Sequence, residues 1–299
     1  MVELVTAVEE YVARVLAVAA QRARLGASYG LGTVPPRFTD AVGGERRPHP
    51  DQRQEPELLT LARHLEPDEV LVDVGGGSGR LGLALAARCR QVVNVERSAD
   101  RLAEFAASAA AAGIDNVRVV QGDWLNVAVS GDVVLAAHVT YAAPDIRSFV
   151  ERLQVAARRR VLILLYEVPA EAQALYQAAH QLVFGEAPEV PPGYRELLPV
   201  LWELGVLPEV QVLGKLGTRA TVASREAAVE RVLQSISAVS GVQLAGNQEA
   251  CRRLLEHADD LFVQAPDGFR PAPTPNEEHR GVLISWPAQP SPQDARDQA

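Results

Sequence analysis

The chain has 299 residues, of which 47% are hydrophobic, and it carries a formal net charge of -9. This content is enough to bury the core of one large domain, or of one domain with a small cap. A general nucleic-acid binder would carry a basic face to replace the counterions of the phosphates, so the acidic balance makes nucleic acid an unlikely partner.

Cysteine usage and the first residues bear on the compartment. Cys89 and Cys251 form no disulfide or zinc-binding pattern, which suits a reducing compartment. The chain begins with acidic residues where a secretory signal needs basic ones. No apolar run approaches the roughly 20 residues that span a bilayer. We therefore expect a soluble, cytoplasmic protein that contacts no membrane.

Two N-terminal segments precede the main pattern. Residues 2–24 place apolar side chains at helical spacing, which predicts an amphipathic helix that packs on the sheet or on a second subunit, as in a homodimer. Residues 31–56 are rich in proline and glycine and predict a loop. We interpret 1–56 as a candidate lid, in which Tyr29 and Arg53 could close over a ligand.

Short apolar strands alternate with helices from Glu57 to Glu167. The pattern predicts strands at 70–74, 91–95, 117–120, 132–137 and 161–165, and helices at 57–65, 81–88, 99–112 and 146–155. Strands made wholly of apolar residues are typical of a parallel sheet that helices cover on both faces. The predicted fold class is therefore α/β, with a doubly wound sheet.

The rest of the chain is less regular. It predicts helices at 170–184, 194–205, 224–236 and 248–263, strands at 209–213 and 281–286, and a proline-rich loop at 264–280. We divide the chain into a core at 57–216 with a helical insertion at 168–208, a helical cap at 217–280, a last core strand at 281–286 and a disordered tail at 287–299. The insertion and the cap are expected to cover the strand ends and form a substrate pocket.

A glycine-rich turn follows the first strand. The stretch Asp73-Val-Gly-Gly-Gly-Ser-Gly79 lets backbone N–H groups and a helix N-terminus approach a ligand. Gly77–Gly82 also matches the dinucleotide fingerprint GxGxxG, but the turn begins earlier, at Gly75. An acid at Asp73 would repel a pyrophosphate and would suit a positively charged ligand. A simpler alternative is that Asp73 is only an acid near a helix N-terminus.

The stretch Val70-Leu-Val-Asp-Val-Gly-Gly-Gly-Ser-Gly79 resembles the first motif of the class I S-adenosylmethionine-dependent methyltransferases. The resemblance covers about residues 57–167 and continues with Glu96 after the second strand, Gly122-Asp123-Trp124 after the third and Asp132–His138 along the fourth. It implies a mostly parallel seven-stranded sheet whose last strand is antiparallel. It also implies S-adenosylmethionine as the cofactor.

The resemblance assigns roles to individual residues. Glu96 is expected to accept hydrogen bonds from the ribose hydroxyls, and Asp123 to read the adenine amino group. Trp124 could lie beside the adenine ring or belong to the core. The expected cofactor-binding residues are Asp73, Gly75, Gly76, Gly77, Gly79, Glu96, Arg97, Asp123, Trp124, Ala137 and His138.

His138 and Tyr141 follow the fourth strand, where this family places the methyl acceptor. A histidine can take a proton from a hydroxyl or an amine near neutral pH, so both residues are candidate catalytic residues; the alternative is that they only line the pocket. We interpret Arg158–Arg160 as a solvated helix end rather than a phosphate site. No acidic cluster predicts a metal at the acceptor site.

These features predict a methyltransferase that acts on an O or N atom of a small molecule. The motif of the adenine N-methyltransferases does not follow the fourth strand, and no cysteine lies there to attack a pyrimidine. Three alternatives remain: a catalytically silent module that binds the cofactor, an RNA or protein methyltransferase, and an NAD-dependent oxidoreductase.

Overall fold

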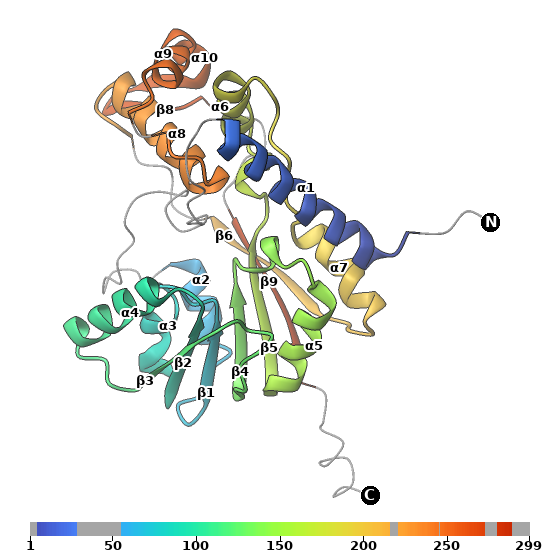
Figure 1. The fold of residues 1–299 in the computed structure, drawn as a ribbon. Coiled ribbons are helices and arrows are strands. Elements are labelled where there is room, and N and C mark those ends of the chain that lie inside the picture. Colours follow the sequence, from blue (N-terminus) through green and yellow to red (C-terminus); the bar gives the residue numbers. More distant parts are fainter. Residues whose placement is uncertain (1–4, 29–54, 216–220, 245, 273–279, 289–299) are drawn as a thin grey trace, which may run out of the picture.

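A seven-stranded sheet forms the centre of the computed structural model, which describes residues 5–28, 55–215, 221–244, 246–272 and 280–288 (Figure 1). Its order is β3-β2-β1-β4-β5-β9-β6. The strands are β1 Val70–Val74, β2 Gln91–Glu96, β3 Val117–Gln121, β4 Gly131–Ala137, β5 Ala157–Tyr166, β6 Glu209–Lys215 and β9 Arg280–Pro287. Strand β9 runs antiparallel to β5 and β6, and the pairs from β3 to β5 are parallel. This confirms the predicted fold class.

Helices cover both faces of the sheet, as its apolar strands require. On one face lie α2 Pro56–Ala62, α3 Gly82–Leu85, the short 3-10 helix η2 Ala86–Arg88 and α4 Ala99–Ala112. On the other lie α1 Ala7–Ser28, α5 Ile146–Ala156 and α7 Tyr194–Glu203. Because side chains alternate along a strand, Leu71 and Asp73 of β1 point to the α3 face, and Val72 and Val74 to the α5 face.

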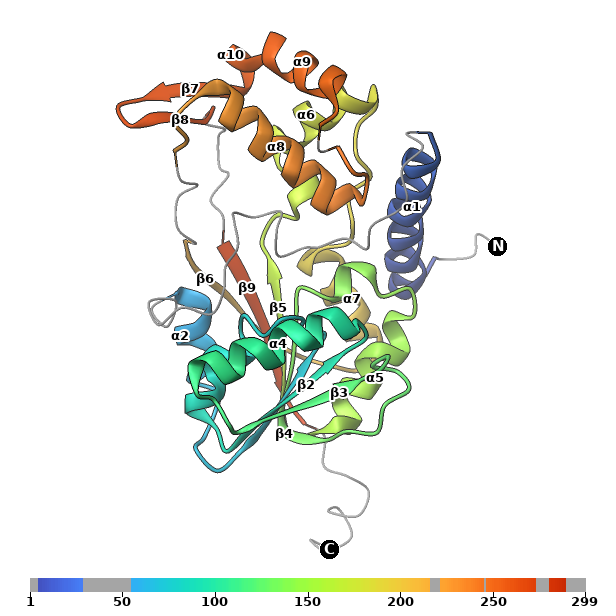
Figure 2. The same ribbon diagram turned by 60° about the vertical axis from the view of Figure 1, so that its left-hand side comes forward.

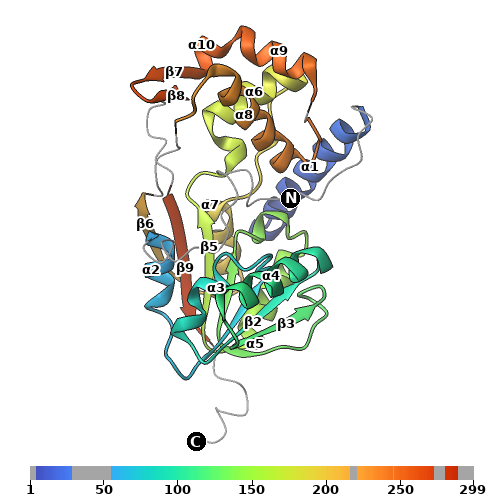
Figure 3. The same ribbon diagram turned by 90° about the vertical axis from the view of Figure 1, so that its left-hand side faces the viewer.

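A second apolar cluster lies outside the sheet. It joins α6 Ala174–Phe184, α8 Arg225–Ser240, α9 Gln248–Glu256 and α10 Ala258–Leu261. Figures 2 and 3 show this cap beyond the end of the sheet at which β4 and β5 finish. The predicted insertion at 168–208 is divided, since α6 packs in the cap cluster and α7 in the core cluster.

The cap also contains a β-hairpin where the sequence predicted only a loop. Strands β7 Phe262–Ala265 and β8 Gly268–Pro271 pair antiparallel, so the expected loop at 264–280 is wrong for its described first part. Pro266-Asp267-Gly268 closes the hairpin, and proline followed by aspartate and glycine is a turn-forming sequence. Residues 273–279 lie outside the described part.

The N-terminal helix joins the core to the cap. It packs against α7 and α5, so it lies on its own subunit's helices. Tyr11 is buried in the core and donates a hydrogen bond to the Thr140 carbonyl at 2.9 Å. Near its other end, Arg22 lies 3.1 Å from Glu171 in the 3-10 helix η4 Ala170–Ala172. Tyr29 and Arg53 lie outside the described residues, so the lid stays a prediction. The predicted disordered tail at 287–299 is wrong at its start, because Pro287 ends β9 and the Ala288 N–H donates to the Arg159 carbonyl at 2.7 Å; residues 289–299 lie outside the described part.

The run Arg158–Arg160 lies in β5, and its interpretation as a helix end is wrong. Helix α5 stops at Ala156, and Ala157 already pairs with Gly131 of β4. Each arginine meets an acid of a neighbouring segment: Arg158 Nε donates to Asp132 at 2.8 Å, Arg159 pairs with Glu69, and Arg160 lies 3.3 Å from Glu209. The run is therefore a strand start held by ion pairs, and Arg158 and Arg159 are exposed to solvent as expected.

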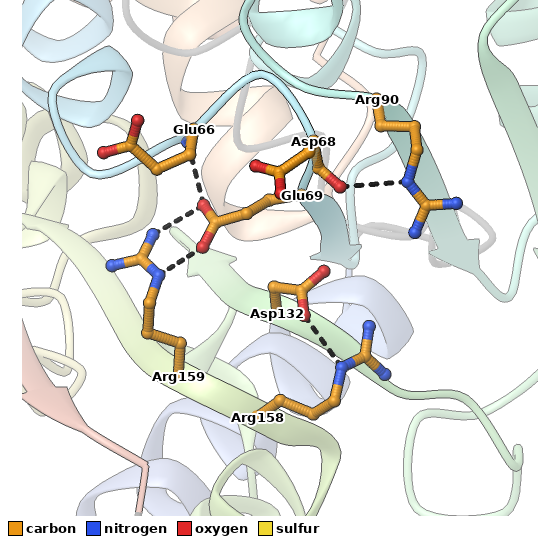
Figure 4. Close-up of a pocket in the computed structure, with 7 residues that line it drawn as sticks. All are labelled: Glu66, Asp68, Glu69, Arg90, Asp132, Arg158 and Arg159. Atoms are coloured by element: carbon orange, nitrogen blue, oxygen red, sulfur yellow. Dashed lines mark hydrogen bonds and ion pairs between the residues drawn. The ribbon is translucent and has the colours of Figure 1, made fainter.

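Two of these arginines line a hollow in the surface, together with Glu66, Asp68, Glu69, Arg90 and Asp132 (Figure 4). The hollow lies where β1, β4 and β5 begin, and the glycine turn follows the end of β1. The starts and the ends of parallel strands lie at opposite edges of the sheet, so the hollow and the glycine turn are on opposite edges. The arginines of the hollow are already bonded, Arg158 to Asp132, Arg159 to Glu69 and Arg90 to the Asp68 carbonyl, so we do not assign the hollow to the candidate site. None of the described helices is both long and apolar enough to cross a bilayer.

Candidate functional site

The glycine turn after β1 adopts a backbone that side chains rarely allow. Gly75, Gly77 and Gly79 have φ angles of 67°, 57° and 93°, in the left-handed region that favours glycine. A Cβ on Gly75 would lie 2.5 Å from Val139 Cγ1. A Cβ on Gly77 would make ordinary contacts, the nearest with Arg101 at 3.7 Å, and this residue is buried. Gly75 and Gly76 are partly exposed, so a ligand can reach the turn at these two residues.

Asp73 lies beneath the turn and not at its open side. The residue is 1% exposed, and a Cβ on Gly76 would lie 2.5 Å from its Oδ2. Burial raises the pKa of its carboxyl to about 7, against the lowering effects of Arg80 and of a backbone hydrogen bond from Gly82. Asp73 is not exposed at the surface of the turn, so its predicted contact with a cationic group of the cofactor stays a prediction.

Asn94 is a polar residue of the site that the sequence interpretation missed. It is fully buried in β2 beside Asp73, and its Nδ2 donates to the Gly77 carbonyl at 3.0 Å. A buried side chain thus holds the middle of the turn. The signal was the single amide in the otherwise apolar segment Val92–Val95.

Two partly exposed acids stand where β2 and β3 end. Glu96 closes β2, and its Oε1 accepts a hydrogen bond from the Ser98 N–H at 2.9 Å. Asp123 follows β3; its Oδ1 accepts from the Leu125 N–H at 2.9 Å, and its Oδ2 lies 3.6 Å from Arg97. The Gly122 N–H donates to the Glu96 carbonyl at 3.0 Å, which keeps the two strand ends together. The structure thus brings Glu96, Arg97 and Asp123 to the edge that carries the glycine turn.

Trp124 belongs to the core, which was the alternative to its predicted place beside the adenine. The residue is 5% exposed, and its ring centroid lies 6.5 Å from that of Phe149. Its indole N–H donates to the Phe149 carbonyl at 3.4 Å, and Arg152 lies over its ring. Because the indole is packed and its N–H is bonded, the structure does not support stacking on adenine.

His138 follows Ala137 at the end of β4 in a strained conformation. Its φ of 56° makes it the one non-glycine residue with a left-handed backbone among the described residues. Such strain costs about 1–3 kcal/mol and clusters at functional sites. The His138 N–H donates to the Leu164 carbonyl at 2.8 Å, and the ring stacks on Tyr166 with 4.1 Å between centroids. The side chain is 11% exposed, and both ring nitrogens are buried.

A buried acid from α2 reaches His138, and this pair was also missed. Glu57 is 1% exposed; its Oε1 lies 3.8 Å from His138 Nε2, and its Oε2 lies 3.2 Å from Arg80. Arg80 also lies 3.6 Å from Glu55. The sequence placed Glu57 at a helix start and Arg80 within a glycine motif, and neither pattern indicates that they meet.

Tyr141 is buried, and its hydroxyl supports the backbone. It accepts a hydrogen bond from the Tyr166 N–H at 2.7 Å. Burial raises the pKa of Tyr141 well above its ordinary value, so the phenol stays neutral over the physiological range. Its catalytic role stays a prediction.

The residues present fit the adenosyl cofactor that the resemblance implies. The turn is partly exposed at Gly75 and Gly76, and the carboxylates of Glu96 and Asp123 can accept hydrogen bonds from hydroxyl and amino groups. Within the described ranges, no three side chains capable of binding a metal come together.

Comparison with known proteins agrees with this geometry. Residues 71–159 match the family described as a methyltransferase domain. A protein-L-isoaspartate O-methyltransferase of Synechococcus sp. (strain JA-2-3B'a(2-13)) is 39% identical over 66 residues, which are 22% of this chain and 27% of that protein. A protein of the same name from Methanoregula boonei is 36% identical over 66 residues, or 30% of its length. The chain thus spans less than a third of the length of these relatives.

Two solved structures share the fold. A Bacillus halodurans protein named as a methyltransferase candidate superposes with a TM-score of 0.52 and 18% identity, covering 79% of this chain and 98% of that one. The YcgJ protein of Bacillus subtilis gives a TM-score of 0.50 and 15% identity, covering 78% and 97%. At these identities the likeness extends to the fold alone.

Proposed function

Because residues 71–159 form a domain of the class I S-adenosylmethionine-dependent methyltransferases, we propose that this chain transfers a methyl group from that cofactor to an O or N atom of a small molecule. One observation carries the proposal. The glycine turn, the acids Glu96 and Asp123, and the strained His138 lie together at one edge of the sheet.

Each residue would contribute a separate interaction. Backbone N–H groups of the turn would bind the amino-acid part of the cofactor, Glu96 would accept from the ribose hydroxyls, and Asp123 from the adenine amine. When bound, S-adenosylmethionine supplies a methyl group on a sulfonium, which a nucleophile takes by direct displacement. The protein then has to align the acceptor and exclude water, and alignment alone can account for much of the rate.

The acceptor would lie between the end of β4 and the cap. An acceptor that begins protonated needs a base, and we propose His138 for this role, with Glu57 as its neighbouring carboxylate. The ring nitrogens are buried, so this role needs the acceptor to displace the groups that cover them.

A small acceptor agrees with the acidic charge of the chain and with the cap. A protein acceptor, as the names of the isoaspartate relatives state for those proteins, is the alternative within the same reaction. It is favoured less, because the match spans only 66 residues. A panel of labelled-methyl assays on amines, phenols, carboxylic acids and an isoaspartyl peptide separates the two.

The first test is calorimetric titration with S-adenosylhomocysteine, with NAD as the control ligand. We expect micromolar binding of the former only. Glu96→Ala and Gly76→Ala should each weaken it by at least tenfold, since the first removes an acceptor and the second places a Cβ 2.5 Å from Asp73 Oδ2. Gly113→Ala is the control for a change of glycine to alanine, because a Cβ there meets nothing within 4 Å and the residue follows α4, away from the turn. Saturable NAD binding without binding of the homocysteine compound would refute the proposal.

A further inference from the structure

Two buried acceptor atoms lie near the same point beneath the glycine turn. Asp73 Oδ2 and Asn94 Oδ1 are buried, and neither has a hydrogen-bond partner within the described residues. They lie 2.5 and 2.7 Å from the point that a Cβ on Gly76 would occupy. Asp73 and Asn94 are partners in the register of β1 and β2, so both side chains leave the sheet on the same face. Two unpaired acceptors in one dry space are costly unless a proton lies between them.

The orientation of the Asn94 amide is set by its other end. Its Nδ2 donates to the Gly77 carbonyl at 3.0 Å, and a carbonyl can only accept. Turning the amide over would place two oxygens against each other. Oδ1 is therefore the atom that remains on the Asp73 side, and it too can only accept.

The groups around Asp73 differ in their effect on its proton. Burial disfavours the ionised carboxyl most, and the charge of Glu96 acts in the same direction. Arg80 and the Gly82 N–H act in the opposite direction. Burial prevails, and it raises the pKa of Asp73 to about 7.

We propose that Asp73 is protonated in the folded protein and donates this proton to Asn94 Oδ1. Asp73, Asn94 and the Gly77 carbonyl then form one hydrogen-bonded chain that holds the glycine turn in shape. Asp73 acts as a positioning residue for the cofactor and is not the ion-pair partner of its ammonium group. The claim that this turn binds the cofactor rests on the proposed function; the position of the proton does not.

The chain of hydrogen bonds makes the cofactor site sensitive to pH. Above neutral pH the carboxyl loses its proton, the bond to Asn94 is replaced by repulsion between two acceptors, and the turn is no longer held. Binding of the cofactor should therefore weaken as the pH rises through 7.

The proton can be observed directly without a ligand. In protein labelled with ¹³C at the aspartate carboxyls, the resonance missing from Asp73→Asn belongs to Asp73. We expect this carboxyl to titrate above pH 6. A carboxyl that is fully ionised by pH 5 would overturn the proposal, whether or not the protein binds a cofactor.

Calorimetry with S-adenosylhomocysteine at pH 6.5 and 8.5 tests the consequence. For wild type we expect Kd to rise about tenfold between these values. In Asp73→Asn the amide N–H supplies the donor at both, so the rise should disappear and the variant should bind more tightly than wild type at pH 8.5. Weaker binding by Asp73→Asn at both pH values would show an ionised contact and overturn the proposal.

The matched control is Asp123→Asn, which changes an acid at the same edge that stands outside this hydrogen-bonded chain and, unlike Glu96, does not shift the pKa of Asp73. It should weaken binding at both pH values and keep the wild-type ratio between them. The ammonium group of the ligand titrates equally in every variant, so only differences in the ratio count. If neither the wild type nor any variant binds the ligand, the proposed function fails. The carboxyl titration still decides the position of the proton.

Discussion

Single glycines in the turn are required for two different physical reasons. Gly75, Gly77 and Gly79 have left-handed φ angles, which a side chain makes strained. Gly76 has an ordinary φ, but a Cβ there would lie within 2.7 Å of both Asp73 and Asn94. The first reason concerns the backbone conformation. The second concerns the space between the turn and the strands β1 and β2. The turn therefore depends on the polar pair beneath it as much as on its own sequence.

The raised pKa of Asp73 has a consequence for stability. Its carboxyl has a pKa of about 7 when folded, against an ordinary value of 3.8, so the folded state holds a proton that the unfolded state releases. Between about pH 4 and 7 the folded state binds more protons, and stability must fall as the pH rises. Above pH 7 this contribution to the free energy of unfolding is lost completely. The loss is at most about 4 kcal/mol.

We expect Asp73→Asn to remove this loss, because an amide has no proton to release. Chemical denaturation at pH 4.5 and 8 should show a variant that matches wild type at the lower pH. At the higher pH its free energy of unfolding should exceed that of wild type by about 1 kcal/mol or more, since each unit of pKa shift corresponds to about 1.4 kcal/mol. The other titrating groups contribute equally to the pH dependence of both proteins, so their contribution cancels in the comparison. A variant that is less stable than wild type at pH 8 would contradict the assignment of the proton to the folded state.

Sequence reasoning placed the acids and glycines of the site but not the contacts between segments. Glu96 and Asp123 were predicted from the resemblance to the methyltransferase family, which implies an acid after the second strand and another after the third. Trp124, Asn94 and Glu57 could not be placed in this way, because each depends on a neighbour that is distant in the sequence: Phe149, Gly77 and His138. The alternation of apolar residues carries no information on such pairs.

At the scale of elements, errors arose where a charged or proline-rich run concealed a strand. Arg158–Arg160 interrupts the apolar pattern at the start of β5, yet acids on neighbouring segments pair with these arginines and allow the strand to begin at Ala157. In the hairpin, the turn Pro266-Asp267-Gly268 was read as part of a loop. The apolar strands and well-capped helices, such as α4 between Ser98 and Gly113, were predicted correctly.

Helix α1 is fastened to the segment that leads into the cap by an ion pair that is largely buried. Arg22 and Glu171 have side chains that are 18% and 5% exposed. Removing the cation leaves Glu171 buried without the charge that offsets its desolvation, so we expect Arg22→Met to lower the free energy of unfolding by about 3 kcal/mol at pH 7. Burial already raises the pKa of Glu171, and protonation should relieve part of the loss at pH 5.

The neighbouring pair Arg24–Glu186 offers the control. It is shorter, at 2.7 Å, but its side chains are 57% and 33% exposed. Water screens such a pair, so Arg24→Met should cost less than about 1 kcal/mol in the same denaturation experiment. The double variant Arg22→Met/Glu171→Leu should regain most of the stability lost by Arg22→Met. Equal losses for Arg22→Met and Arg24→Met would mean that burial does not determine the strength of these contacts.

At the scale of the whole molecule, the chain has two apolar interiors with different tasks. The clusters around the sheet support every residue assigned to the cofactor, whereas the cap cluster contains none of them. The cap is built from segments before and after β6 and returns to the sheet through β9. We therefore expect the cap to respond to an acceptor and the sheet to hold the cofactor.

Hydrogen exchange with S-adenosylhomocysteine tests this division. At a ligand concentration of about 100 times Kd, binding should stabilise the core by about 2.7 kcal/mol, which slows exchange of amides that open with the core by about 100-fold. We expect this protection in peptides that contain β1, β2 and β4, and little change in α8 and α9, which lie in the other interior. A true acceptor added with the homocysteine compound should then protect the cap. If α9 is protected by the cofactor product alone as strongly as β1, the two interiors open as one unit, and acceptor specificity cannot be assigned to an independent cap.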